Sequence, residues 1–190
     1  DVYLSPERLD RVKTAMGKIG QGKSSEITFD EADAMATFWH EITHNRNKVG
    51  ILPQLETETL AMEMMNEFVA RKTLPEFYTK LGCSKIPYPE FMENRESTGY
   101  NRRVLGYDFI IQKLGLDPVK VLESAKTSLY NQHYRTQAHA AGQALLYGGL
   151  DKIRRIDGKS ITKAQLARII NFCCQDMSLI DIRDLLKKEK

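Results

Sequence analysis

Helix start signals recur along this chain, and no pattern of alternating strands accompanies them. Ser5 and Asp117 each stand directly before a proline, and Thr28 stands three residues before Glu31. A short polar side chain before proline, or a Thr-x-x-Glu pair, satisfies the free N–H groups of a first helical turn. An α/β fold would require strands between such helices. The pattern therefore predicts a mostly α fold with little or no sheet.

Apolar spacing and breaker residues predict where the helices end. Glycines at 17–22 interrupt the first helix, and a second Thr-x-x-Glu pair, Thr73 with Glu76, predicts that the chain restarts or kinks there. Asp157 and Gly158 lie between short mixed runs, which is typical of a hairpin turn. The expected helices cover about 6–18, 28–47, 57–71, 73–82, 101–114, 118–131 and 136–147, with two short ones beginning near 162 and 178.

Composition excludes several classes of protein. The chain has 190 residues, a net charge of +3 and 42% apolar residues. This balance excludes a disordered or collagen-like chain and does not by itself indicate a nucleic-acid partner. No apolar run approaches the roughly 18 residues of a membrane span, so no membrane partner is expected. Cys83, Cys173 and Cys174 form no C-x-x-C pair, and as reduced buried thiols they predict a cytoplasmic, reducing compartment.

Residues 17–24, GKIGQGKS, match the phosphate-binding pattern G-x-x-x-x-G-K-[ST]. About 0.007 such matches are expected by chance in this composition. A phosphate loop needs a buried strand before it and a helix directly after it. The preceding residues 11–16 are polar and helical in period, and the next helix starts several residues late. A Gly/Lys linker is therefore favoured, and nucleotide binding through Gly22, Lys23 and Ser24 is kept as an alternative.

Residues 40–44, HEITH, match the zinc-peptidase pattern H-E-x-x-H, for which about 0.006 chance matches are expected. His40 and His44 lie one helical turn apart, so their rings are close enough to share one ion. Glu41 lies beside them and reaches the same region without being a ligand. The Thr28 cap starts this helix about three turns earlier, which places both histidines well inside it.

A third ligand must come from elsewhere in the chain. The longer metzincin pattern fails, because no histidine follows His44 at the required spacing. Glu63 lies 19 residues after His44 (63 − 44) on the next expected helix, and Glu67 lies one turn further on the same face. This pair suits one ligand and one carboxylate that orients a ligating histidine. We favour Glu63 as the ligand and keep Glu67 as the orienting or alternative ligand.

At these residues the chain resembles the gluzincins, metallopeptidases with H-E-x-x-H and a downstream glutamate. Residues 63–67 resemble the E-x-x-x-D motif of thermolysin-like members, with Glu67 in place of the aspartate. Residues 66–70, NEFVA, also resemble the E-F-x-A motif of lethal-factor-like and phage or mobile-element metallopeptidases, in which Glu67 would be the ligand. The resemblance covers about residues 28–80 and implies a zincin-like helical core within a larger phage or mobile-element protein.

The resemblance implies a zinc-dependent peptidase that hydrolyses peptide bonds in a peptide or protein substrate. Zinc held by His40, His44 and Glu63 would activate water, with Glu41 as general base. The developing oxyanion needs a further donor, for which we favour Tyr100 in a Gly-containing loop. Tyr107, His133 and His139 are the other candidates for that donor.

The expected organisation has three parts: a helix and Gly-rich linker at 1–27, a zincin-like core at 28–100 and a helical region at 101–190. A basic cluster in the last part could contact nucleic acid or an acidic partner, although a solvated face is the simpler interpretation. A non-catalytic helical module that binds DNA or protein is therefore the second alternative. The cluster consists of Lys152, Arg154, Arg155, Lys159, Lys163 and Arg168.

Overall fold

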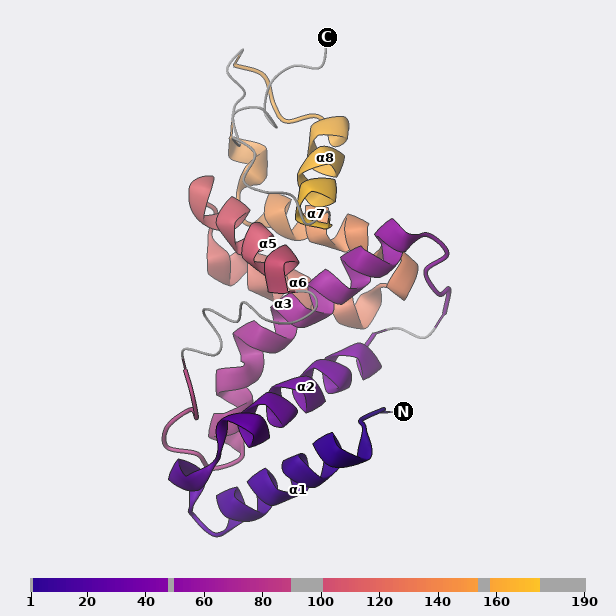
Figure 1. The fold of residues 1–190 in the computed structure, drawn as a ribbon. Coiled ribbons are helices and arrows are strands. Elements are labelled where there is room, and N and C mark those ends of the chain that lie inside the picture. The colour runs from indigo at the N-terminus through magenta and orange to yellow at the C-terminus, as the bar shows by residue number, and fades with distance from the viewer. Residues whose placement is uncertain (1, 48–49, 90–100, 154–157, 175–190) are drawn as a thin grey trace. The chain divides into compact units, whose positions relative to one another are not determined.

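The computed structural model describes residues 2–47, 50–89, 101–153 and 158–174. Over these ranges the chain forms α-helices joined by short turns and 3₁₀ segments, and it contains no strand, which confirms the mostly α prediction (Figure 1). Within the same ranges, no helix combines the length and apolar character that crossing a bilayer requires. The helices are α1 (Pro6–Gly20), α2 (Phe29–Asn45), α3 (Glu56–Lys80), α5 (Asn101–Lys113), α6 (Pro118–Asn131), α7 (Gln137–Tyr147) and α8 (Lys163–Cys174).

The predicted caps at Ser5, Thr28 and Asp117 begin helices as expected. The Ser5 hydroxyl accepts a hydrogen bond from the backbone N–H of Arg8, with proline at the first helical position of α1. Thr28 and Glu31 exchange both bonds of a capping box at the start of α2. The Asp117 side chain accepts from two N–H groups at the start of α6. These local side-chain bonds explain why the helix starts are readable from sequence.

Contacts divide the chain into two compact units, and α3 runs through both. The first unit contains residues 1–46 and 66–97. In it α1 lies alongside α2, and the later part of α3 completes the core (Figure 1). Trp39 of α2 stacks on Phe77 of α3 with ring centroids 4.4 Å apart, and its Nε1 donates to the Thr73 hydroxyl at 2.9 Å. This pairing sets the rotation of α2 about its axis.

The second unit contains residues 47–65 and 98–190. Here α6 packs against α7, and α8 packs against α5 and α7. The turn after α7 approaches α6 so closely that a Cβ on Gly148 would lie 2.4 Å from a methyl group of Val121. The core is apolar and includes Ile110, Val121, Leu129, Leu145, Leu150 and Ile169.

The predicted restart at Thr73 is wrong, because α3 continues from Glu56 to Lys80 with Pro75 inside it. The Thr73 hydroxyl donates to the carbonyl of Val69 and accepts from Trp39, so it does not cap a new helix. Proline removes one backbone donor and its ring crowds the carbonyl four residues earlier, which together cost a helix about 3 kcal/mol. Burial of Leu74 and Tyr78 against the first core outweighs that loss, so the helix persists through the proline.

Four other sequence predictions fall wholly or partly outside the described residues. The hairpin turn involves residues 154–157, the basic cluster includes residues 154 and 155, the last short helix would begin near 178, and Tyr100 lies within 90–100. Cys83 and Cys173 are buried free thiols, as predicted. The side chain of Cys174 is not among those described.

Candidate metal centre

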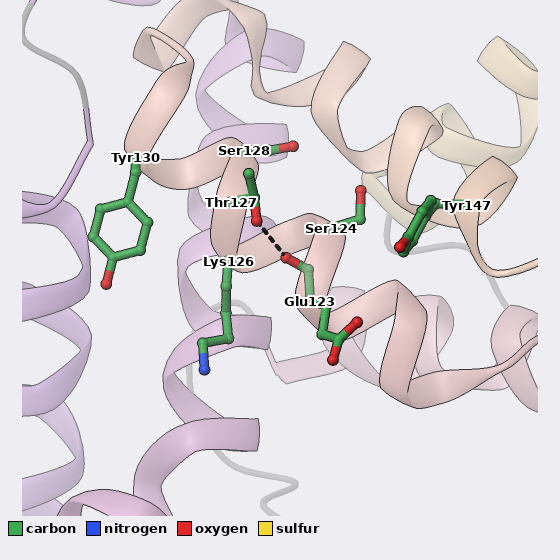
Figure 2. Close-up of a pocket in the computed structure, with 7 residues that line it drawn as sticks. All are labelled: Glu123, Ser124, Lys126, Thr127, Ser128, Tyr130 and Tyr147. Atoms are coloured by element: carbon green, nitrogen blue, oxygen red, sulfur yellow. Dashed lines mark hydrogen bonds between the residues drawn. The ribbon is translucent and has the colours of Figure 1, made fainter.

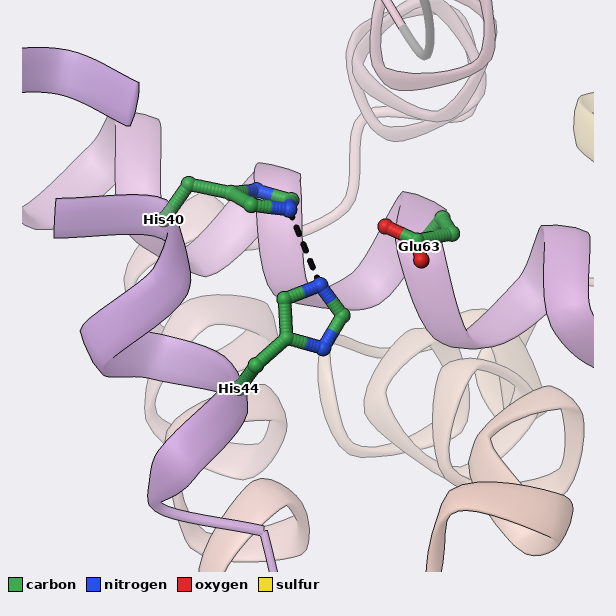
Figure 3. Close-up of side chains that lie close together, drawn as sticks. All are labelled: His40, His44 and Glu63. Carbon is green, nitrogen blue, oxygen red and sulfur yellow. Dashed lines mark hydrogen bonds between the residues drawn. The ribbon is translucent and has the colours of Figure 1, made fainter. Parts of the chain in front are cut away.

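Two histidines of α2 bring their Nε2 atoms close together. His40 and His44 lie one turn apart in the last part of α2, and their Nε2 atoms are 2.9 Å apart (Figure 3). The buried side of the same helix carries Trp39 and Thr43, which are 9% and 1% exposed. Since those two residues face the core, the helical repeat turns the histidine pair toward α3.

Glu63 completes the cluster from α3. One ligand atom from each of His40, His44 and Glu63 lies within 4.8 Å of the other two, and all three residues are partly buried (Figure 3). α3 is continuous past residue 66, so one helical turn determines where Glu63 stands relative to Glu67. Glu67 itself contacts His40 within the first unit. Three side chains with metal-ligating atoms therefore lie close together.

Glu67 contacts the Nδ1 atom of the His40 ring. Its Oε2 lies 2.7 Å from His40 Nδ1, and its Oε1 accepts a hydrogen bond of 2.6 Å from Arg71 Nε. An ionised carboxylate only accepts, so this close approach favours the His40 tautomer with its proton on Nδ1 and a lone pair on Nε2. Burial raises the pKa of Glu67, but the His40 hydrogen bond and the Arg71 charge outweigh it and hold that pKa below its usual value.

The three side chains fit a small divalent cation. Zinc–nitrogen bonds of about 2.0–2.1 Å at a tetrahedral angle place two ligating nitrogens about 3.3 Å apart. The observed 2.9 Å between the Nε2 atoms needs an opening of a few tenths of an ångström, which a small rotation of either ring supplies. Two imidazoles and a carboxylate suit zinc and also other divalent first-row ions. Three protein ligands leave a coordination position for solvent or substrate, as in catalytic sites.

Glu41 and Tyr107, two further candidates from the sequence, have different surroundings in the structure. Glu41 is partly buried and lies next to His40 on α2, where the motif requires it. Tyr107 is fully buried and its hydroxyl donates to the carbonyl of Ala141 at 2.8 Å, so its donor is already used. Burial also raises the pKa of Tyr107 well above its usual value. Tyr107 is thus a core residue of the second unit.

The two other histidines are placed in the second unit. Nδ1 of His133 is buried, and a Cβ on Gly50 would lie 2.1 Å from it, so the ring packs directly on that glycine. His139 is exposed and lines an apolar groove of about 380 Å³ between α7 and α8. Neither histidine is a member of the His40–His44–Glu63 cluster.

The candidate phosphate loop has a different conformation from the one its sequence pattern requires. Residues 17–20 are the last turn of α1, and no strand precedes them. The N–H groups of Gln21, Gly22 and Lys23 donate to carbonyls of α1. Lys18 Nζ lies 2.8 Å from both carboxylate oxygens of Glu31. Backbone donors that close a helix are not directed at a phosphate, so this segment is a helix end followed by a turn.

A wider hollow lies on the surface of α6 and α7, in the second unit. It encloses about 610 Å³ beside Glu123, Lys126, Tyr130 and Tyr147 (Figure 2). Both tyrosines are half exposed, and the Thr127 hydroxyl is used locally in a bond to the Glu123 carbonyl. This hollow contains no cluster of metal-ligating side chains among the residues that line it. The candidate centre is therefore the His40–His44–Glu63 cluster.

Arg71 is the member of this region that sequence reasoning missed. The available signal was its i+4 spacing from Glu67, which allows an ion pair on a helix.

No protein-family model, curated protein or solved structure matches this chain.

Proposed function

We propose that this protein is a zinc-dependent peptidase whose centre consists of His40, His44 and Glu63. The observation that supports it most strongly is the contact between Glu67 and His40 Nδ1 at 2.7 Å. Such a contact orients a histidine so that its other nitrogen can bind a metal. It occurs on the H-E-x-x-H helix, beside a carboxylate whose oxygen lies within 4.8 Å of both rings. The arrangement of these side chains and the motif thus support the same chemistry.

The proposed roles follow from the donor types. Bound zinc would polarise the carbonyl of the scissile bond and make water a stronger nucleophile. Glu41 takes a proton from the attacking water and passes it to the leaving amine, so that a C–O bond forms and the C–N bond breaks. Glu67 does not touch the substrate in this scheme, because its oxygens are directed at His40 and Arg71. Tyr100 remains the proposed oxyanion donor.

The metal is tested by elemental analysis of the purified protein after exchange into metal-free buffer. We expect one zinc per chain in the unchanged protein. His44→Ala should lose it, because one of three ligands is gone. His139→Ala is the matched control, since that histidine is exposed on another helix, and it should retain the metal. Equal zinc content in all three proteins would remove His44 from the centre.

The reaction is tested with Glu41→Gln, assayed on fluorescence-quenched peptide libraries. We expect peptide hydrolysis to fall by roughly 10²-fold or more while zinc content stays unchanged, because the amide cannot accept the proton of water. Circular dichroism of the variant should match the unchanged protein. Full activity in Glu41→Gln would exclude Glu41 as the base, and zinc binding without any peptide cleavage would point to a non-catalytic metal site.

A further inference from the structure

Three charged residues follow one another at successive turns on one face of α3. Glu63 belongs to the metal cluster, Glu67 contacts His40, and Arg71 contacts Glu67. The Arg71 side chain is 10% exposed and that of Glu67 is 15% exposed. An i to i+4 ion pair so thoroughly removed from solvent differs from the surface pair of Lys80 with Glu76 on the same helix, whose side chains are 74% and 54% exposed.

Two contacts divide the Glu67 carboxylate between two partners. Oε1 receives the Arg71 Nε–H at 2.6 Å and Oε2 faces His40 Nδ1 at 2.7 Å. A carboxylate held at both oxygens has no freedom to rotate about its last torsion. Without Arg71, Oε1 would lose this donor, and the group could turn away from His40 or toward the metal position. Glu63 one turn away adds like-charge repulsion, which the guanidinium offsets.

We propose that Arg71 is a positioning residue of the metal centre, which acts through Glu67 to hold the His40 ring in the tautomer and orientation that present Nε2 to a divalent cation. This inference rests on the proposed metal-binding function. The guanidinium suits the role because its planar Nε–H presents one fixed donor direction to a carboxylate oxygen. Arg71 itself touches neither metal nor substrate.

The sign of the effect on metal affinity separates positioning from simple electrostatics. A cation near a metal site repels the incoming ion, so loss of Arg71 through charge alone would tighten binding. Loss of positioning would weaken it. The affinity for Zn²⁺ is measured by competition with a chromophoric chelator at one pH, for the unchanged protein, Arg71→Gln, Glu67→Gln and the double variant. Lys80→Gln is the matched control on α3.

We expect Arg71→Gln to weaken Zn²⁺ binding by about 3–10-fold and Glu67→Gln by about 10–100-fold. The double variant should bind as Glu67→Gln does, because Arg71 has no effect once its intermediary is gone. Lys80→Gln should bind as the unchanged protein does. Unchanged or tighter binding in Arg71→Gln, or full additivity in the double variant, would overturn the proposal.

A second readout needs no metal. Nitrogen-15 NMR of the neutral imidazoles reports which ring nitrogen carries the proton. In the metal-free protein we expect His40 as the Nδ1–H tautomer, and a mixture of tautomers in Arg71→Gln. If the unchanged protein binds no zinc, the peptidase proposal fails and this comparison alone decides the role of Arg71. An unaltered His40 tautomer in Arg71→Gln would refute the positioning role of Arg71.

Arg71→Lys keeps the charge and one donor without the planar geometry, and it serves if the glutamine variant does not fold. It should fall between the unchanged protein and Arg71→Gln in both measurements. A lysine variant that matches the unchanged protein in both would show that charge suffices and would remove the geometric role of the guanidinium.

Discussion

Trp39 connects the core of the first unit to the candidate metal centre, although it is not one of the candidate ligands. Its indole stacks on Phe77 and donates to Thr73, while the next residue along α2 is His40. The guanidinium of Arg46 lies 4.7 Å from the centre of the indole ring. A large aromatic side chain with a satisfied polar atom has one preferred position in a core. Trp39 therefore determines which way the neighbouring histidines point.

Removal of the Trp39 hydrogen-bond partner should be costly. Thr73→Val keeps the side-chain shape but leaves the indole N–H buried without this acceptor. We expect the free energy of unfolding to fall by about 1–3 kcal/mol. Urea titration followed by fluorescence measures this directly, because Trp39 is the chain's one tryptophan.

Thr79→Val is the matched control on the same helix. Its hydroxyl donates to the carbonyl of Pro75, as that of Thr73 does to Val69, but Thr79 is exposed and accepts no indole bond. Its effect should stay within about 0.5 kcal/mol. Equal effects of the two substitutions would show that the Trp39 bond contributes nothing to stability.

Two helices of the first unit are joined by a partly buried ion pair. Lys18 of α1 contacts both oxygens of Glu31, which also caps α2 through the N–H of Thr28. Burial raises the pKa of Glu31, but the Lys18 and Thr28 bonds outweigh burial and lower it from its usual value of 4.5. Lys18, which lies within the match to the phosphate-binding pattern, thus links α1 to α2.

The lowered pKa of Glu31 predicts a pH-dependent stability. A carboxyl whose pKa is depressed on folding stabilises the protein above its unfolded pKa, and this contribution is lost as the pH falls through the folded pKa. Glu31→Gln should therefore lower the free energy of unfolding by about 1–3 kcal/mol at pH 7. The difference from the unchanged protein should shrink below about pH 4.5.

Glu7→Gln provides the comparison for this pH dependence. Glu7 pairs with Arg11 at 2.7 Å on α1, but its side chain is 75% exposed. Such a pair contributes little in water, so the variant should unfold like the unchanged protein at every pH. A constant difference between Glu31→Gln and the unchanged protein down to pH 3 would contradict the assigned role of the Glu31 charge.

Two glycines should respond in opposite ways to replacement by alanine, because one lies at the close contact between α6 and the end of α7 and the other lies in open space on α1. Gly148→Ala places a methyl group 2.4 Å from Val121 and 3.4 Å from the Asp117 carbonyl. We expect a loss of about 1–3 kcal/mol in the free energy of unfolding. Gly17→Ala meets no atom within 4 Å inside helix α1, and it should stabilise by about 0.5–1 kcal/mol. Thermal unfolding of both variants checks the signs, and stabilisation by Gly148→Ala would contradict the close approach.

On the scale of the whole molecule, local signals predicted much of the helical architecture. The starts of α1, α2 and α6 each depend on a side chain that bonds within three residues along the chain, so no distant contact is needed to predict them. The break in α3 was mispredicted for the opposite reason. Thr73 resembles a cap locally, but burial of its neighbours against α2 decides that the helix continues.

The candidate site was partly readable in the same way. One helical turn between His40 and His44 makes their proximity a property of spacing alone. Glu63 and Glu67 could not be ranked firmly from sequence, since both lie on one face of the same helix. In the structure Glu67 lies 2.7 Å from Nδ1 of His40, whereas Glu63 offers a carboxylate oxygen within 4.8 Å of a ligand atom of each histidine.

The sequence by itself determined the helical class, the helix starts and the facing pair of imidazoles, because each depends on interactions within a few residues. Only the tertiary structure decided that α3 is unbroken, that Lys18 and Tyr107 are already engaged, and that Arg71 supports the carboxylate behind His40. Those outcomes depend on which buried surfaces meet and which polar groups must then be satisfied. These are properties of packing between segments far apart in the chain.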